Sequence, residues 1–164
     1  MTGQTGTILD VRALTQSRET LAYSGGGLFP ILALAPGGAV VGVARGGAGH
    51  LGIAGRVDAI RSLDGGDTWT PPATLADSEW DDRDYAFGVS PSGTLILAYH
   101  RCGCYDPDGT YRPERYRETD PHLSEVRVTR SRDGGLTWEL PVPLNFAPLR
   151  PCNPFGKIVA LADG

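Results

Sequence analysis

The chain has 164 residues, of which 40% are hydrophobic and 21% charged, values that are ordinary for a single soluble globular domain. Its formal net charge of −4 gives no electrostatic basis for binding nucleic acid, and no apolar run is long enough to span a membrane. Residues 1–11 lack the basic start and apolar stretch of a secretory signal, so the default expectation is a cytoplasmic protein. The 23 glycines and 13 prolines favour many short strands joined by tight turns.

The first part of the chain predicts three strands after a lead-in strand within residues 1–23. Leu28–Ala35 and Ala39–Arg45 flank a Pro-Gly-Gly turn at 36–38, which indicates a hairpin. Arg56–Arg61 then alternates apolar and polar residues, as a half-buried strand does.

The same order returns further along the chain. Tyr85–Ser90 and Thr94–His100 flank a Pro-Ser-Gly turn, and Glu125–Arg130 alternates like the earlier third strand. Phe155–Leu161 is predicted to open a third copy.

An eight-residue motif follows the third strand of each copy. The sequence S-L-D-G-G-D-T-W at 62–69 returns as S-R-D-G-G-L-T-W at 131–138, with six of the eight positions identical. One repeat is therefore hairpin, loop, strand, octapeptide and strand. Four antiparallel strands are the content of one β-propeller blade, so repeats of this kind predict a propeller.

The predicted fold is an all-β propeller of four-stranded antiparallel blades. Residues 24–76 form the first blade, 77–147 the second, and 148–164 the start of a third. Blades bury their faces against one another, and about two and a half blades do not close a ring. We therefore expect the sequence to be incomplete at its C-terminus.

The residue types of the octapeptide suit a tight turn. Serine and aspartate side chains accept hydrogen bonds from turn N–H groups, glycines adopt left-handed backbone angles, and the tryptophan packs beneath the corner. The alternative of a metal or phosphate loop is less favoured. The residues predicted to have this structural role are Ser62, Asp64, Gly66, Trp69, Ser131, Asp133, Gly135 and Trp138.

Strand parity predicts which loops share a face. If each hairpin turn and octapeptide lies at the bottom, the loops 46–55 and 101–123 and the connectors near 76–84 and 145–154 meet at the top. Loops that converge at one end of a propeller make its usual binding site.

The S-x-D-G-G-x-T-W pattern resembles the Asp-box, or BNR repeat, of the sialidase superfamily, whose propellers have six blades. The resemblance implies an exo-glycosidase that hydrolyses terminal acidic sugars from glycans without a cofactor, with the fragment itself inactive. An alternative is a non-catalytic Asp-box propeller that binds glycan or protein through its top face. A third possibility is a chain that does not fold alone.

The family carries a substrate-binding arginine eight residues before the hairpin-turn proline, in a Phe/Tyr-Arg-Ile-Pro motif. The matching positions here are Leu28 in the first repeat and Arg83 in the second, with Pro154 in the third. The resemblance thus implies that Arg83 binds substrate and that the adjacent Asp84 is a candidate acid. Further substrate-binding candidates at this face are Arg45, His100 and Arg101.

The family's general acid comes from the first top loop, but the loop 46–55 contains no carboxylate and only His50 titrates there. The family's tyrosine nucleophile, its glutamate partner and two more arginines come from later blades. The loop 101–123 is richer in candidate groups, to which no roles are assigned. They are Tyr105, Asp106, Asp108, Tyr111, Glu114, Tyr116, Glu118, Asp120 and His122.

Three cysteines are predicted to lie on the same face, close to His100. Cys102, Cys104 and Cys152 allow a zinc site, a disulfide from Cys152 to one of the pair, or buried thiols. The Cys-Gly-Cys spacing is not that of a usual zinc site, so no metal is predicted.

Overall fold

The computed structural model describes residues 10, 12, 14, 17–116, 123–145 and 153–161. These residues form nine β-strands in two sheets and one short 3₁₀ turn, η2 (Pro113–Tyr116), with no α-helix among them. In this described part of the chain no helix has the length and apolarity needed to cross a membrane. The predicted all-β class is confirmed.

The first sheet contains four antiparallel strands in the order of the sequence. They are β1 (Leu28–Leu34), β2 (Val40–Gly46), β3 (Arg56–Ser62) and β4 (Ala73–Ala76). The first three strands begin and end within one residue of the predicted boundaries. Their positions follow from local patterns, because alternating Val and Ala residues and glycine turns mark strand and turn directly.

The hairpin between β1 and β2 illustrates this local control. Gly37 and Gly38 have φ angles of +83° and +88°, which residues with a side chain rarely adopt. The turn is closed by a hydrogen bond of 2.8 Å from Ala35 N to Ala39 O.

The second sheet has five strands in the order β8-β7-β6-β5-β9. Its strands are β5 (Asp81–Val89), β6 (Leu95–Cys102), β7 (Ser124–Ser131), β8 (Val142–Pro143) and β9 (Gly156–Lys157). All neighbours are antiparallel except β5 and β9, which are parallel.

Two features of this sheet differ from the prediction. β5 begins at Asp81, four residues before the predicted start at Tyr85, because the backbone of Asp81 and Asp82 pairs with the end of β6. The charged sequence there gives no strand pattern. The predicted strand Phe155–Leu161 is reduced to β9, which adds to the edge of β5 instead of opening a third sheet. An open strand edge attracts any extended segment that can complete its hydrogen bonds.

The described residues among 1–23 form no strand, unlike the predicted lead-in strand. Residues in this stretch instead run past the octapeptide turn, where Thr20 Oγ1 donates a hydrogen bond of 2.8 Å to Gly66 O.

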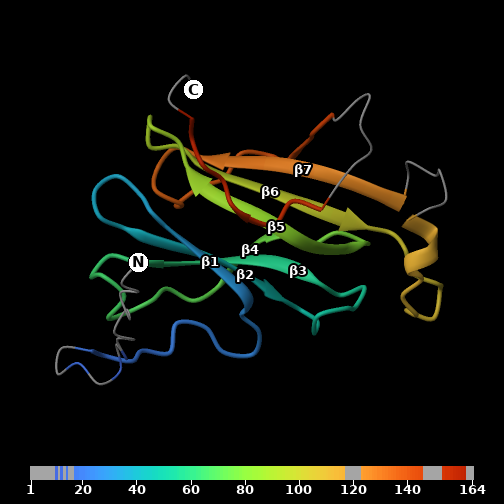
Figure 1. Cartoon of the computed structure of the whole chain (residues 1–164), viewed down its shortest axis with the longest axis horizontal. Helices are drawn as coiled ribbons and strands as arrows, with labels where there is room; N and C mark the ends of the chain where they lie inside the picture. The colour runs from blue at the N-terminus through green and yellow to red at the C-terminus, as the bar shows by residue number, and fades with distance from the viewer. Residues whose placement is uncertain are drawn as a thin grey trace, which may run out of the picture.

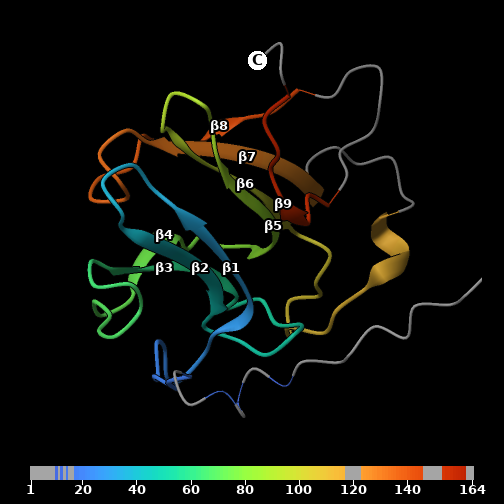
Figure 2. The ribbon, with the colours of Figure 1, turned by 60° about the vertical axis from the view of Figure 1, so that its left-hand side comes forward.

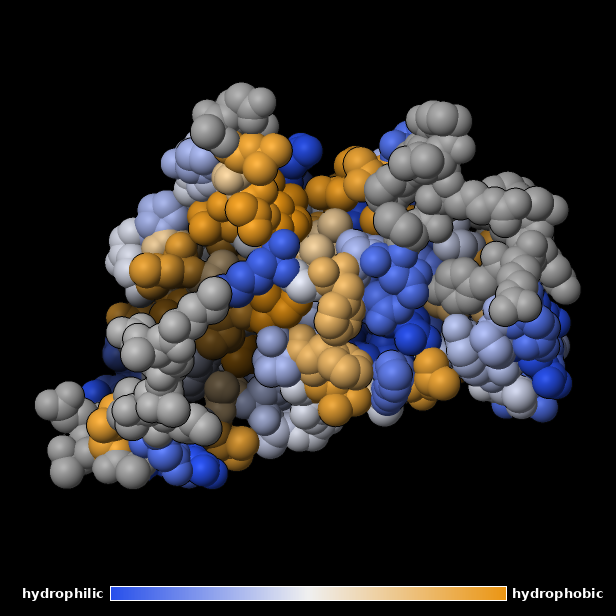
Figure 3. Space-filling model, viewed as in Figure 1, coloured by the Kyte–Doolittle hydropathy of each residue, from blue (hydrophilic) through white to orange (hydrophobic). Residues whose placement is uncertain are grey.

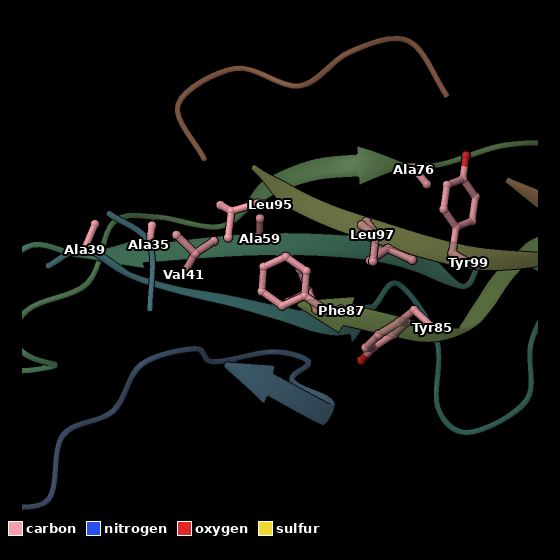
Figure 4. Close-up of a cluster of buried hydrophobic side chains, with 12 residues drawn as sticks. Ala35, Ala39, Val41, Ala59, Ala76, Tyr85, Phe87, Leu95, Leu97 and Tyr99 are labelled. Carbon is pink, nitrogen blue, oxygen red and sulfur yellow. The ribbon is translucent and has the colours of Figure 1, made fainter. Parts of the chain in front are cut away.

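The two sheets pack face to face around one apolar core (Figures 1 and 2). Val41 and Val43 of β2 lie against Phe87 of β5 and Leu95 and Leu97 of β6, all without exposed surface. Figure 4 shows Val41, Phe87, Leu95 and Leu97 between the layers. In β2, β3, β5 and β6, alternate residues lie in this core, as the period of a β-strand requires.

The two octapeptides fold into the same turn. In the first, Ser62 Oγ accepts a hydrogen bond of 2.8 Å from Gly66 N, and Asp64 accepts bonds from Thr68 N and Thr68 Oγ1 at 2.9 and 2.5 Å. In the second, Gly135 N bonds Ser131 Oγ, and Thr137 N and Oγ1 bond Asp133 with the same lengths. The motif therefore specifies its own geometry.

The hydrogen bonds of these turns lower the pKa of both aspartates well below the usual range, with the threonine side-chain bonds as the largest cause. We expect Asp64→Asn and Asp133→Asn each to lower the melting temperature by a few degrees at pH 7, because the charged acceptor is lost. The deficit should shrink as the pH falls below about 4, where the wild-type carboxylates begin to protonate, on the unfolded chain first. Thermal unfolding followed by circular dichroism from pH 7 to 2 measures both effects.

Asp67→Asn is the matched control, because Asp67 lies in the first octapeptide but forms only an exposed ion pair with Arg18. A deficit in the Asp64 variant no larger than that of the control would contradict a structural role for the turn carboxylate.

Candidate functional site

Four segments that are distant in sequence meet at one end of the two sheets, as strand parity predicts. The loop 46–55 contacts the start of β5 through a bond of 3.0 Å from Asp82 N to Gly55 O, and contacts the loop after β6 through Gly52 N and Tyr105 Oη at 3.0 Å. The segment before β9 joins them where Asn153 Nδ2 donates to Asp84 Oδ2 at 2.9 Å. We call this end the top face.

The first strand of each sheet, β1 and β5, has the same backbone irregularity near its start at the top face. The register of β1 shifts between Leu28 and Ile31, and that of β5 shifts between Arg83 and Tyr85. Phe29 and Asp84, each just after the position matched to the family arginine, have φ angles of +53° and +41°. A left-handed angle at a non-glycine residue costs free energy and is concentrated at functional sites.

Arg83 lies almost buried beside two carboxylates. Its Nε donates to Asp84 Oδ2 at 3.0 Å, and its Nη1 lies 3.5 Å from Asp81 Oδ2. Burial alone would lower the pKa of Arg83, but the charges of Asp84 and Asp81 outweigh it and raise the pKa. Within the described residues, Nη1 is buried and has no hydrogen-bond partner, so this donor is unsatisfied inside the protein.

Arg45 is enclosed in the protein, with 1% of its surface exposed. Its Nη1 pairs with Asp81 Oδ1 at 2.7 Å, while its other donors bond the carbonyl oxygens of Gly49 at 2.6 Å and Gly52 at 3.3 Å. A bond of 3.1 Å from Nη1 to the carbonyl oxygen of Asp82 completes the set. We therefore assign Arg45 the role of positioning the loop 46–55, in place of the predicted substrate contact.

His100 is fully buried beside Arg83, its partner in the β5–β6 register. Its Nε2 lies 2.9 Å from Ser124 Oγ. Burial first and the charge of Arg83 second lower the pKa of His100 to about 4, so the ring is neutral at pH 7. This placement gives His100 a supporting role under the site rather than the predicted contact with a ligand.

Arg101 is also committed to protein partners. Its guanidinium pairs with Glu125 at 2.9 Å and with Glu79 at 3.0 Å, and stacks over Trp80 with 4.9 Å to the ring centroid. Only 12% of the side chain is exposed. All three predicted arginines therefore face at least one carboxylate.

The described part of the loop 101–123 closes one side of Arg83. Tyr111 lies with its ring centroid 5.7 Å from the guanidinium carbon, and Tyr105 donates a bond of 2.5 Å to Asp81 Oδ2. Asp106 is paired with Arg112 and Arg115 at 2.5 and 2.7 Å, away from Arg83. The exposed Asp108 and Glu114 carry no assigned role. The predicted candidates Glu118, Asp120 and His122 lie outside the described residues, as does the side chain of Tyr116.

Cys102 and Cys104 are fully buried in a small cluster with Tyr105. Cys152 lies outside the described residues, so its disulfide stays a prediction. Across the described ranges, no group of three or more His, Cys, Asp or Glu side chains is placed to hold a metal ion.

A group of three rings on the top face escaped the sequence analysis. Phe29 lies edge-on to His50 with 5.2 Å between ring centroids and edge-on to Phe155 with 6.0 Å. The three residues come from β1, the loop 46–55 and the segment before β9, and all are exposed. Nothing in the local sequence pairs them, because only the folding of the two sheets brings them together.

Comparison with known proteins finds similarity in structure but not in sequence. No family model and no curated protein matches the chain. The Hadza microbial sialidase Hz136 aligns over 72% of this chain and 26% of its own length, with a TM-score of 0.56 and 19% identity. A protein of unknown function from Dyadobacter fermentans aligns over 78% of this chain and 39% of its own, with a TM-score of 0.53 and 21% identity.

The chain therefore spans less than half the length of these two structures. At such low identity the alignments establish architecture alone. The chain has an all-β fold that is similar to that of a sialidase.

Proposed function

We propose that the chain is part of a sialidase-like β-propeller that binds the terminal sugar of a glycan at its top face. The observation that carries the proposal is the pair Arg83 and Asp84. A strained backbone holds them side by side where four segments converge, and the Asp84 carboxylate keeps the capacity to accept a further hydrogen bond. Sugars are recognised by such paired charged donors and acceptors, because each hydroxyl both donates and accepts.

The proposal treats each sheet as one blade and the equivalent octapeptide turns as Asp-boxes at the bottom. The outer face of the first sheet supports this assignment, since it is apolar and borders an open groove. A groove of about 370 Å³ there is lined by residues that include Leu32, Ile60 and Trp69. In a propeller such a face packs against the neighbouring blade.

The test is saturation-transfer NMR of the 164-residue chain with a panel of methyl pyranosides. We expect binding by at least one sugar, weakened about tenfold or more by Asp84→Asn, which keeps the shape but removes the charged acceptor. Asp67→Asn at the opposite end is the matched control and should bind as the wild type does. Absence of binding by the whole panel, or equal binding by both variants, would refute the proposal.

A second candidate function is exo-glycosidase activity of the sialidase type, which the similarity of fold to a sialidase favours. Such hydrolysis uses a tyrosine nucleophile activated by a carboxylate. The five tyrosines whose side chains are described all have a raised pKa, with burial as the largest cause, which disfavours the phenolate. Because the resemblance assigns the tyrosine nucleophile to later blades, the top face described here supports the binding proposal, and a catalytic role for Asp84 stays a prediction.

A further inference from the structure

We propose that the top face selects neutral sugars, whose apolar ring face stacks on Phe29, His50 and Phe155 while their hydroxyls bond Asp84 and Asn153. This inference rests on the proposed function and names its ligand class. It departs from the acidic sugar that the sequence resemblance implies.

The charges of the site argue against a carboxylate on the ligand. Arg83 lies next to Asp84 and Asp81, and Arg45 and Arg101 are each paired with acidic residues. At the position matched to Arg83 in the first repeat stands Leu28, which has no charge. Among the described residues named for this site, no cation is unpaired. The carboxylate of an acidic sugar would therefore approach the Asp84 carboxylate without a compensating positive charge, and like charges repel.

The three rings offer a surface of the right kind for the carbon–hydrogen face of a pyranose. Phe29 is 37% exposed and Phe155 is 66% exposed, and His50 lies edge-on to Phe29 at the rim. In Figure 3 hydrophobic surface gathers on the side of the view where β1 and the C-terminal segment lie, while hydrophilic surface covers the side of the loop after β6. Exposed aromatic rings at a binding face gain free energy when a ligand covers them.

The platform and the hydrogen-bonding groups are joined by short connections. Tyr85, which follows Asp84, donates from its hydroxyl to the carbonyl oxygen of Phe29 at 2.9 Å. Asn153, two residues before Phe155, donates to Asp84 Oδ2 at 2.9 Å. Asp84 Oδ1 makes no hydrogen bond with the described residues, which leaves it to accept from a sugar hydroxyl.

The experiment compares matched sugars that differ only at C6, where a neutral hydroxymethyl group is replaced by a carboxylate: methyl β-glucoside against methyl β-glucuronide and methyl β-galactoside against methyl β-galacturonide. Affinities of the 164-residue chain are measured by NMR titration at pH 7. We expect the neutral member of at least one pair to bind about tenfold more tightly than its acid. Phe155→Ala should weaken that neutral sugar about tenfold, because one stacking ring is lost.

Phe29→Asn is a second variant, since asparagine tolerates the left-handed backbone angle but removes the ring. Leu140→Ala, which changes an exposed apolar residue outside the platform, should have no effect. If an acid binds as tightly as its neutral partner, or if both ring variants bind normally, this inference is overturned while the proposed function stands. If no sugar binds at all, the proposed function itself fails.

Discussion

Replacing Arg45 with methionine is expected to lower the free energy of unfolding by about 3–5 kcal/mol, since it removes the closest cationic partner of the buried Asp81. Asp81 has no exposed surface, and its Oδ1 lies 2.7 Å from Arg45 Nη1. The substitution also removes the bonds to the carbonyl oxygens of Gly49 and Gly52, so the loop that carries His50 loses its anchor. Urea unfolding followed by tryptophan fluorescence measures the change.

The Arg45→Met/Asp81→Asn double variant is expected to recover part of the loss, because it removes the uncompensated charge. Arg132→Met is the exposed control. Arg132 forms a pair with Glu139 at 2.9 Å, but its side chain is 68% exposed, so the variant should change the stability by less than about 1 kcal/mol. Equal effects of Arg45→Met and Arg132→Met would show that Arg45 does not hold the top face together.

The stability of the wild-type chain is expected to fall as the pH decreases from about 6.5 to 4, with His100 contributing up to about 3 kcal/mol. Burial and the charge of Arg83 lower the pKa of His100 to about 4 in the folded chain, whereas the unfolded chain binds a proton near pH 6.5. Protonation below pH 6.5 therefore favours the unfolded state. The stability that goes with a neutral His100 is fully present above pH 6.5, decreases as the pH falls below 6.5, and is lost as the pH falls through 4.

His100→Gln should remove this part of the slope while it keeps a hydrogen-bonding group near Ser124. Urea unfolding at half-unit steps from pH 7.5 to 4 gives the comparison. Burial raises the pKa of Asp82, so its protonation stabilises the folded chain as the pH falls and opposes the effect of His100. Because Asp82 is present in both proteins, its effect cancels in the difference between their slopes. A His100→Gln chain with the wild-type slope would contradict the buried neutral state.

Much of the fold could be predicted from local sequence. The Pro-Gly-Gly turn, the alternation of β2 and β3 and the two octapeptides each depend on hydrogen bonds and backbone angles within a few residues. The start of β5 could not be predicted in this way. Asp81 and Asp82 read as loop residues, and they join a strand only because the end of β6 pairs with them and buries them.

The candidate site, too, could be predicted only in part from local sequence. Spacing from the hairpin turn singled out Arg83, which the structure places on the top face beside Asp84. Arg45 and His100 were predicted to bind substrate from their place at the same face, but their side chains are buried. Burial depends on what the opposite sheet and the loops supply, and a single strand pattern does not contain that information.

By itself, the sequence of this protein determined the strand order of the first sheet, the tight turns and the equivalence of the two repeats, because those features need contacts over short chain distances only. Tertiary structure alone decided which charges are paired, which histidine is buried, and that Phe29, His50 and Phe155 meet. The reason is physical: the pairing and burial of a side chain depend on groups up to 126 positions away (155 − 29). Only the packing of one sheet on the other brings such groups within contact distance.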